Sequence, residues 1–159
     1  MKKLLLLIPI IGIVCWSFQS PKRTVFMVGD STMANKQANN FPETGWGQAL
    51  SYFADTTKIS IDNHARNGRS TKSFIDEGLW GKVEEKIKPG DYVFIQFGHN
   101  DEKKDKPNVY ARAETAYKAN LTKMVDETRA KGGIPVLFTS IVRRDFAPNG
   151  KLNDTHGIY

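Results

Sequence analysis

The sequence predicts an α/β fold in which helices cover both faces of a parallel sheet. Short runs of β-branched and apolar residues alternate with segments whose apolar side chains recur at helical spacing. The runs are almost continuously apolar, as expected of parallel strands buried on both faces. With 159 residues, 40% hydrophobic and 25% charged, the chain is expected to form one globular domain with a substantial core.

Four apolar runs, each bounded by turn residues, are the expected strands. They occupy residues 24–28, 58–62, 92–97 and 134–140. The turn sequence Pro89-Gly90-Asp91 precedes the third run and separates it from the helix before it.

Helices are expected between these strands, over residues 44–54, 70–77, 79–87 and 110–130. In the first, Trp46, Leu50 and Phe53 recur at spacings of four and three and should face the core. The last helix should end at Lys131-Gly132-Gly133, because glycine commonly terminates helices. One side of that helix carries Tyr117, Leu121, Met124, Val125 and Thr128.

Residues 1–17 have the layout of a secretory signal peptide, with a basic start, an apolar run and small residues before a cut after Ser17. An uncleaved membrane anchor is the alternative, but the run is shorter than the roughly 20 residues of a membrane span. A lipoprotein signal at Cys15 is a third interpretation, against which Val14 counts. We therefore expect a secreted or periplasmic protein with no membrane span after cleavage.

Cleavage would lower the formal net charge from +6 to +4, because Lys2 and Lys3 are removed. It would also remove Cys15, the single cysteine, and with it any disulfide or thiol nucleophile. The remaining positive charge favours an acidic partner through steering, or serves solubility alone. The basic residues are scattered and form no aromatic-basic module, so we expect no nucleic-acid partner.

Polar, glycine-bearing segments follow the first three expected strands. They are Gly29-Asp30-Ser31, residues 64–70, and Gly98-His99-Asn100-Asp101. Because ligands bind beyond the carboxyl ends of strands in open parallel sheets, the three segments predict one shared site.

An ester hydrolase needs an activated nucleophile and donors directed at the oxyanion of its tetrahedral intermediate. Ser31 can supply the nucleophile. The backbone N–H groups of Ser31 and Gly68 and the side-chain amide of Asn100 can supply the donors. Each residue also has a purely structural interpretation, as a helix N-cap, a tight turn and a loop brace respectively.

The ordered segments resemble the SGNH (GDSL) hydrolase superfamily, which is named for its serine, glycine, asparagine and histidine. VGDSTMA, GWGQAL, NHARNGRS and FGHND resemble its rhamnogalacturonan acetylesterase branch more narrowly. The resemblance covers residues 24 to about 140 in order. It implies a three-layer α/β/α sandwich with a flavodoxin-like parallel sheet.

The resemblance further implies removal of acetyl groups from a plant cell-wall polysaccharide, of pectin or rhamnogalacturonan type, through a serine acyl-enzyme. Ser31 matches the nucleophile, Gly68 and Asn100 match the oxyanion donors, and Asp30 matches the supporting acid beside the serine. The expected partner is an acetylated polysaccharide, and the full-length protein is expected to be a monomer.

The family's general base, a histidine in an Asp-x-x-His motif, has no match in this sequence. Asp154-Thr155-His156 is one residue too short, and we interpret it as a loop feature that resembles the motif by chance. No covering helix or fifth strand follows residue 140. Residues 22–159 are therefore expected to be an incomplete SGNH domain, truncated at its C-terminus, that is poorly soluble and nearly inactive alone.

Other polar and aromatic residues near the motifs suggest substrate contacts. His99 is disfavoured as the base because adjacent residues in an extended segment point apart, so packing or substrate contact is expected. Trp46 is expected to form a site wall or to stack on a sugar ring. Arg66 and Arg69 flank Gly68. We expect Arg69 to contact a galacturonate carboxylate, and the alternative is a solvated surface charge.

No cofactor or metal is expected. His64, His99 and His156 lie in separate loops without metal-ligand spacing, and Gly45-Trp46-Gly47 lacks the next glycine of a dinucleotide-binding loop. His64 is expected to be structural.

Three alternatives to the acetylesterase stay open. They are an SGNH lipase or thioesterase with another acyl substrate, a non-catalytic carbohydrate-binding SGNH remnant, and a bare structural domain.

Overall fold

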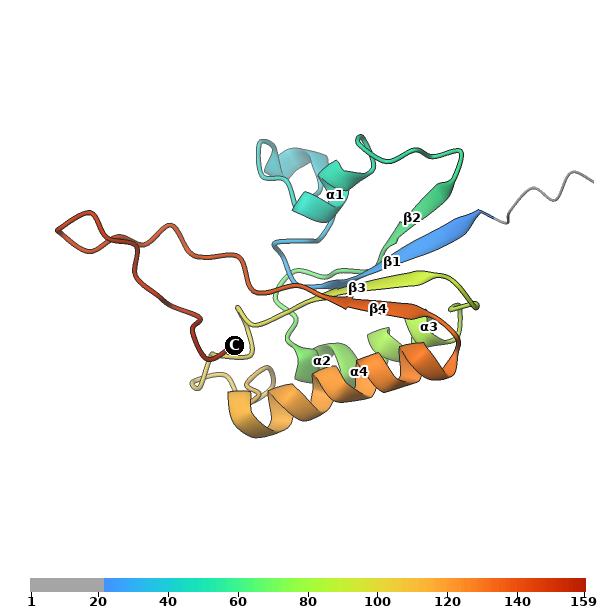
Figure 1. Cartoon of the computed structure of the whole chain (residues 1–159). Coiled ribbons are helices and arrows are strands. Elements are labelled where there is room, and N and C mark those ends of the chain that lie inside the picture. Colours follow the sequence, from blue (N-terminus) through green and yellow to red (C-terminus); the bar gives the residue numbers. More distant parts are fainter. Residues whose placement is uncertain (1–21) are drawn as a thin grey trace, which may run out of the picture.

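A four-stranded parallel sheet forms the centre of the computed structural model, which describes residues 22–159 (Figure 1). The strand order is β2-β1-β3-β4, and every neighbouring pair is parallel. The strands are β1 (Arg23–Gly29), β2 (Ile59–Asn63), β3 (Tyr92–Gln96) and β4 (Ile134–Leu137). The four predicted strands are confirmed, although β4 ends at Leu137 rather than at residue 140. The predicted signal peptide, residues 1–17, lies outside the described residues.

Strand β1 lies in the middle of the sheet and contributes to a core on each face. Phe26 and Val28 belong to one buried cluster, whereas Val25 and Met27 belong to the other. Successive side chains of a strand point to opposite faces, so an uninterrupted apolar run fills both cores.

Helices cover both faces of the sheet, which confirms the predicted three-layer α/β/α arrangement (Figure 1). Helices α2, α3 and α4 pack on one face through side chains that include Phe74, Trp80 and Met124. Helix α1 packs on the other face through Trp46 and Leu50. The bounds are α1 (Trp46–Leu50), α2 (Thr71–Asp76), α3 (Leu79–Glu84) and α4 (Lys118–Ala130), with a 3-10 turn η1 (Ala38–Asn40) and a π-helical turn η2 (Ala113–Tyr117).

The first predicted helix is wrong in its length. Helix α1 has five residues, and Phe53 beyond it is 84% exposed instead of facing the core. The chain leaves the sheet in a turn, in which Phe53 N–H donates to the Leu50 carbonyl, so Phe53 has no apolar surface to meet. The predicted apolar side of the last helix is confirmed, since Tyr117, Met124 and Thr128 are buried.

Two glycines let helix α1 approach the loop after β1. A Cβ atom at Gly45 would lie 2.1 Å from the Ala34 carbonyl oxygen, and one at Gly47 would lie 2.5 Å from that of Met33. The backbone N–H of Trp46, between them, donates to the Thr32 carbonyl at 2.9 Å. The GWG sequence therefore places Trp46 beside the loop that carries Ser31.

The loop after β3 is tied to helix α2 by Asp101, which is fully buried. Its Oδ1 accepts hydrogen bonds from the backbone N–H and the hydroxyl of Thr71, at 3.0 and 2.5 Å. Its Oδ2 has no hydrogen-bond partner within residues 22–159. Burial raises the pKa of Asp101 to about 6, although the hydrogen bonds from Thr71 oppose this rise.

The outer edge of β4 has no strand partner within the described chain. Apolar side chains are exposed on and after this strand, at Leu137, Ile141 and Val142. Such an edge is a template for pairing with another strand. Within residues 22–159, no helix combines the length and the apolar character that a membrane crossing would require.

Replacement of Phe74 tests the larger core. Phe74 is fully buried and packs edge-on against Phe97, with ring centroids 5.4 Å apart. We expect Phe74→Ala to lower the free energy of unfolding by about 3–5 kcal/mol, measured by urea denaturation. Phe53→Ala, at an exposed site, should change it by less than about 0.5 kcal/mol. Equal losses of unfolding free energy in the two variants would contradict the end of α1 at Leu50 and the exposure of Phe53 beyond it.

Asp101 should make stability depend on pH. Between about pH 4 and pH 6 the folded state keeps a proton that the unfolded state has lost, so the free energy of unfolding falls as pH rises. Asp101→Asn removes this titration. From pH 4 to pH 7, the variant should therefore gain on the order of 3 kcal/mol relative to the wild type, measured by denaturation at each pH.

The exposed Asp105 offers a matched control. Asp105→Asn should follow the wild type across the same range of pH. A constant difference between Asp101→Asn and the wild type would show that Asp101 does not hold its proton more tightly in the folded state.

Candidate active site

The three predicted loops lie together at the carboxyl edge of the sheet and contact each other through polar atoms. The backbone N–H of Arg66 donates to the Gly29 carbonyl at 3.0 Å, which joins the glycine loop to the serine loop. The Asn100 side-chain amide donates to the Arg69 carbonyl at 2.9 Å. His99 Nδ1 lies 4.0 Å from Asp30 Oδ2. The contacts link each pair of loops, as the parallel order of their strands predicts.

Ser31 lies in the wall of an open pocket of about 470 Å³, which we call the serine pocket. Its side chain is partly exposed, and its hydroxyl makes no hydrogen bond within the described residues. The hydroxyl is therefore free to meet a ligand. The pocket is lined by Ser31, Thr32, Lys36, Glu43, Thr44, Gly45, Trp46, Ala49 and Ile141.

Asp30 is buried behind Ser31 and shapes the serine loop. Its Oδ1 accepts from the backbone N–H of Thr32 at 2.8 Å, and the Thr32 hydroxyl lies 2.9 Å from the same oxygen. The role of Asp30 as the supporting acid stays a prediction. The carboxylate holds the turn that presents Ser31 at the end of β1.

Gln96, which the sequence analysis missed, is buried at the end of β3 and holds the pocket wall. Its Oε1 accepts from Trp46 Nε1 at 2.6 Å, and its Nε2 donates to the Thr139 carbonyl at 2.8 Å. Trp46 also packs on Phe138, with ring centroids 5.3 Å apart. Trp46 is thus a fixed wall of the serine pocket. A polar residue that ends an otherwise apolar strand was the available signal for Gln96.

Gly68 is a glycine because of its backbone conformation. Its φ is +76°, and a Cβ atom there would meet nothing within 4 Å. A side chain at this position would be strained, because this φ lies in the left-handed region that favours glycine. Its N–H makes no backbone hydrogen bond within residues 22–159 and is available to a ligand.

The structure places Asn100 as a brace between loops. It is buried, donates through Nδ2 to Arg69, and accepts at Oδ1 from Lys103 at 2.6 Å. Neither Asn100 nor Gly68 lines the serine pocket. The roles of Gly68 and Asn100 as oxyanion donors stay predictions.

The guanidinium of Arg69 is already paired. Its Nε and Nη2 each lie 3.0 Å from Glu77 Oε2, and its Nη1 donates to the Asn67 carbonyl at 3.0 Å. A substrate carboxylate would have to displace Glu77. This arrangement weakens the predicted contact between Arg69 and galacturonate.

Two histidines that the sequence assigns to separate loops meet at this edge. The rings of His99 and His156 lie with their centroids 4.4 Å apart. His99 Nε2 lies 2.6 Å from the Ile141 carbonyl oxygen, which only accepts, so Nε2 carries the proton and Nδ1 faces Asp30. The two histidines are 57 positions apart in the chain, and no local sequence pattern predicts their contact.

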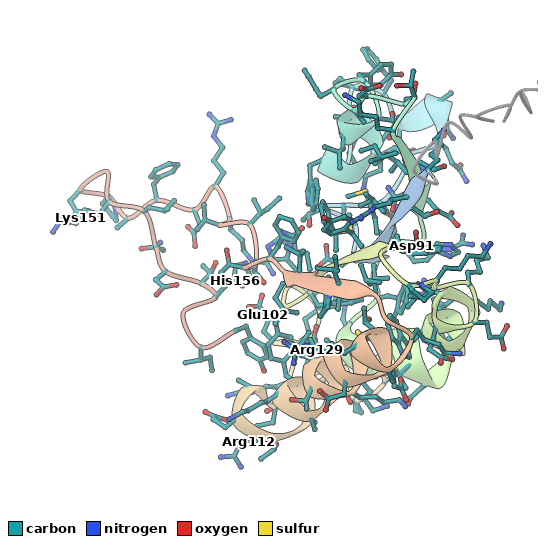
Figure 2. The ribbon with its side chains drawn as sticks, turned by 45° about the vertical axis from the view of Figure 1, so that its right-hand side comes forward. Asp91, Glu102, Arg112, Arg129, Lys151 and His156 are labelled. Atoms are coloured by element: carbon teal, nitrogen blue, oxygen red, sulfur yellow. The ribbon has the colours of Figure 1, made fainter. Side chains whose placement is uncertain are left out.

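His156 is buried where the tail after β4 meets the loop after β3, beside Glu102 (Figure 2). Its Nδ1 lies 2.6 Å from Glu102 Oε2, whereas its Nε2 has no hydrogen-bond partner in the described chain. Burial opposes ionisation of Glu102, but hydrogen bonds from Arg143 and His156 outweigh it and lower the pKa of Glu102. The Asp154-Thr155-His156 segment is thus an anchored part of the site edge.

His64 lies apart from this cluster. Its Nε2 is 3.0 Å from Asp62 Oδ2, in keeping with a structural role. Over residues 22–159, no three side chains of His, Cys, Asp or Glu gather in a way that could hold a metal ion.

Comparisons with known proteins place this site in a family. The model of the GDSL-like lipase/acylhydrolase family matches residues 27–157. Rhamnogalacturonan acetylesterase RhgT of Bacillus subtilis (strain 168) is 39% identical over 135 residues, which are 85% of this chain and 56% of that protein. Probable rhamnogalacturonan acetylesterase YesY of the same organism is 35% identical over 130 residues, 82% of this chain and 59% of that protein.

The crystal structure of protein YxiM from Bacillus subtilis superposes with a TM-score of 0.69 and 31% identity, covering 81% of this chain and 36% of that one. This chain spans somewhat more than half the length of the two curated relatives. The matched residues run from the middle of β1 to the histidine pair and include all three loops. The chain therefore belongs to the GDSL-like lipase/acylhydrolase family.

Proposed function

We propose that this chain carries the nucleophile and oxyanion hole of a secreted serine esterase that removes acetyl groups from a plant cell-wall polysaccharide of rhamnogalacturonan (pectin) type. The observation that carries the proposal is Ser31, with an unbonded hydroxyl in the wall of an open pocket, at the junction of three mutually contacting loops. The names of RhgT and YesY support the substrate. Secretion is proposed from residues 1–17 of the sequence alone.

The proposed reaction has two stages. The Ser31 hydroxyl oxygen attacks the acetyl carbonyl carbon, and a general base takes the hydroxyl proton. The N–H groups of Ser31 and Gly68 and the amide of Asn100 bind the oxyanion that develops. The intermediate then releases the sugar hydroxyl, which regains the proton, and leaves acetyl on Ser31. Water hydrolyses this ester to acetate and restores the serine.

Several polar side chains line part of the serine pocket. Lys36 Nζ lies 2.7 Å from Glu43 Oε1, and the lysine side chain is only 3% exposed. Thr32 and Thr44 add hydroxyl groups to the same wall.

The general base is proposed to be the histidine of an Asp-x-x-His motif in the full-length protein, which residues 1–159 do not contain. Neither His99 nor His156 is then the base, and neither lines the serine pocket. On this proposal the isolated chain has little turnover. A second candidate is a non-catalytic carbohydrate-binding protein that keeps the groove.

Replacement of Ser31 separates the two candidates. In the full-length protein, Ser31→Ala should lower kcat for acetate release from acetylated rhamnogalacturonan by at least about 1,000-fold, because the acyl-enzyme cannot form. The exposed Ser51 offers a control, and Ser51→Ala should leave kcat unchanged. Absence of acetate release by the wild type, with retained polysaccharide binding, would favour the binding protein.

Replacement of Asn100 tests the oxyanion hole. Asn100→Ala should lower kcat by about 100- to 1,000-fold with little change in KM. Lys103→Met removes only the contact to Asn100 Oδ1, so it should cost less than about tenfold. If Asn100→Ala lowers the melting temperature but not kcat, Asn100 is a loop brace alone.

A further inference from the structure

A second cavity, of about 720 Å³, lies beside the serine pocket and shares no lining residue with it. We call it the amide cavity. Its wall is formed by the loop after β1 and by the glycine loop. Its size is that of pockets that bind small ligands. The side chains that matter here are Asn35, Gln37, Asn40, Arg66, Asn67 and Arg69.

Five carboxamide side chains give the cavity its chemistry, those of Asn35, Gln37, Asn40, Asn63 and Asn67. Each carboxamide offers two N–H donors and one carbonyl acceptor, which matches hydroxyl groups that both donate and accept. Gln37 and Asn40 make no side-chain hydrogen bond within residues 22–159, and both are exposed. Asn67 uses its Oδ1 to accept from Lys36 at 3.1 Å, which leaves its NH₂ group available.

One cation on this wall lacks an acidic partner. Arg69 is paired with Glu77, and His64 with Asp62. Arg66 is exposed, and its guanidinium forms no ion pair or hydrogen bond with any residue of the described chain. A free guanidinium binds a carboxylate through two parallel hydrogen bonds, a geometry that a neutral sugar cannot use.

Lys36 joins the amide cavity to the serine pocket. Its Nζ contacts Glu43 Oε1 in the serine pocket at 2.7 Å and Asn67 Oδ1 in the amide cavity at 3.1 Å. The side chain is almost fully buried. The two hollows are therefore held in a fixed relation, as neighbouring sugar residues of one polysaccharide would require.

We propose that the amide cavity is a saccharide subsite that binds a uronate residue of the substrate chain, with its carboxylate on Arg66 and its hydroxyls on the carboxamides. The subsite determines which polymer presents its acetyl group to Ser31. Its place in catalysis rests on the proposed function, but the binding of uronate does not require chemistry at Ser31.

Binding is tested in the full-length protein with Ser31→Ala, so that turnover plays no part. A galacturonic acid trimer and a neutral galactose trimer are titrated separately by isothermal calorimetry. The acidic trimer should bind at least about tenfold more tightly than the neutral one. Arg66→Gln should abolish this preference, and Arg66→Lys, which keeps the charge but not the fork, should restore only part of it.

Arg129→Gln is the matched control, because it removes the same charge from an exposed residue of α4 (Figure 2) that does not line the cavity. It should leave both affinities unchanged. If Arg66→Gln and Arg129→Gln weaken binding of the acidic trimer equally, the preference for it follows from net charge alone. That result would overturn the proposal. Equal affinity for the two trimers would overturn it as well.

Hydrolysis of p-nitrophenyl acetate separates this inference from the proposed function. With Ser31 intact, Arg66→Gln should lower kcat/KM for this small ester far less than for acetylated rhamnogalacturonan, because the small ester has no uronate. The same Arg66→Gln variant should raise KM for acetylated rhamnogalacturonan at least about fivefold. If Ser31→Ala spares ester hydrolysis, the proposed function fails, and the uronate preference is still decided by the titration.

Discussion

The buried amide of Gln96 is the interaction on which the site depends most. One side chain at the end of β3 accepts a hydrogen bond from Trp46, lies 3.1 Å from the Thr32 hydroxyl, and donates to the Thr139 carbonyl. It thereby joins the serine loop, helix α1 and the segment after β4. A neutral amide serves this position because it donates and accepts at once without the cost of burying a charge.

The other contacts between the loops also use few charged groups. Most are made by backbone groups or by carboxamides, as between Arg66 and Gly29 or between Asn100 and Arg69. The cations near the serine are paired, as Lys36 is with Glu43, or lie at the rim, as Arg66 does. The result is two hollows joined by one almost fully buried lysine.

The parallel sheet and the three site loops could be predicted from the sequence, because apolar runs bounded by turn residues fix the strands. Parallel order then brings the segments after β1, β2 and β3 to one edge. Helix α1 was harder, since the spacing of Trp46, Leu50 and Phe53 does not reveal that the chain leaves the sheet after Leu50.

Contacts between residues far apart in the sequence could not be predicted. The stacking of His99 on His156 and the neutralisation of Arg69 by Glu77 depend on where the tail and α2 pack, and no periodicity encodes that. The left-handed φ of Gly68 is likewise a property of the folded turn. Nucleophile and oxyanion roles rest on family resemblance together with this geometry, and they stay predictions until the chemistry is observed.

The most direct measurement is to map the covalent adduct formed when the full-length protein reacts with a fluorophosphonate. Trypsin should release TVFMVGDSTMANK, residues 24–36, and tandem mass spectrometry can assign the modified residue. An activated nucleophile at the end of β1 predicts a single stoichiometric adduct on Ser31. An unmodified peptide, or an adduct on another serine, would contradict the central claim that this loop performs the chemistry.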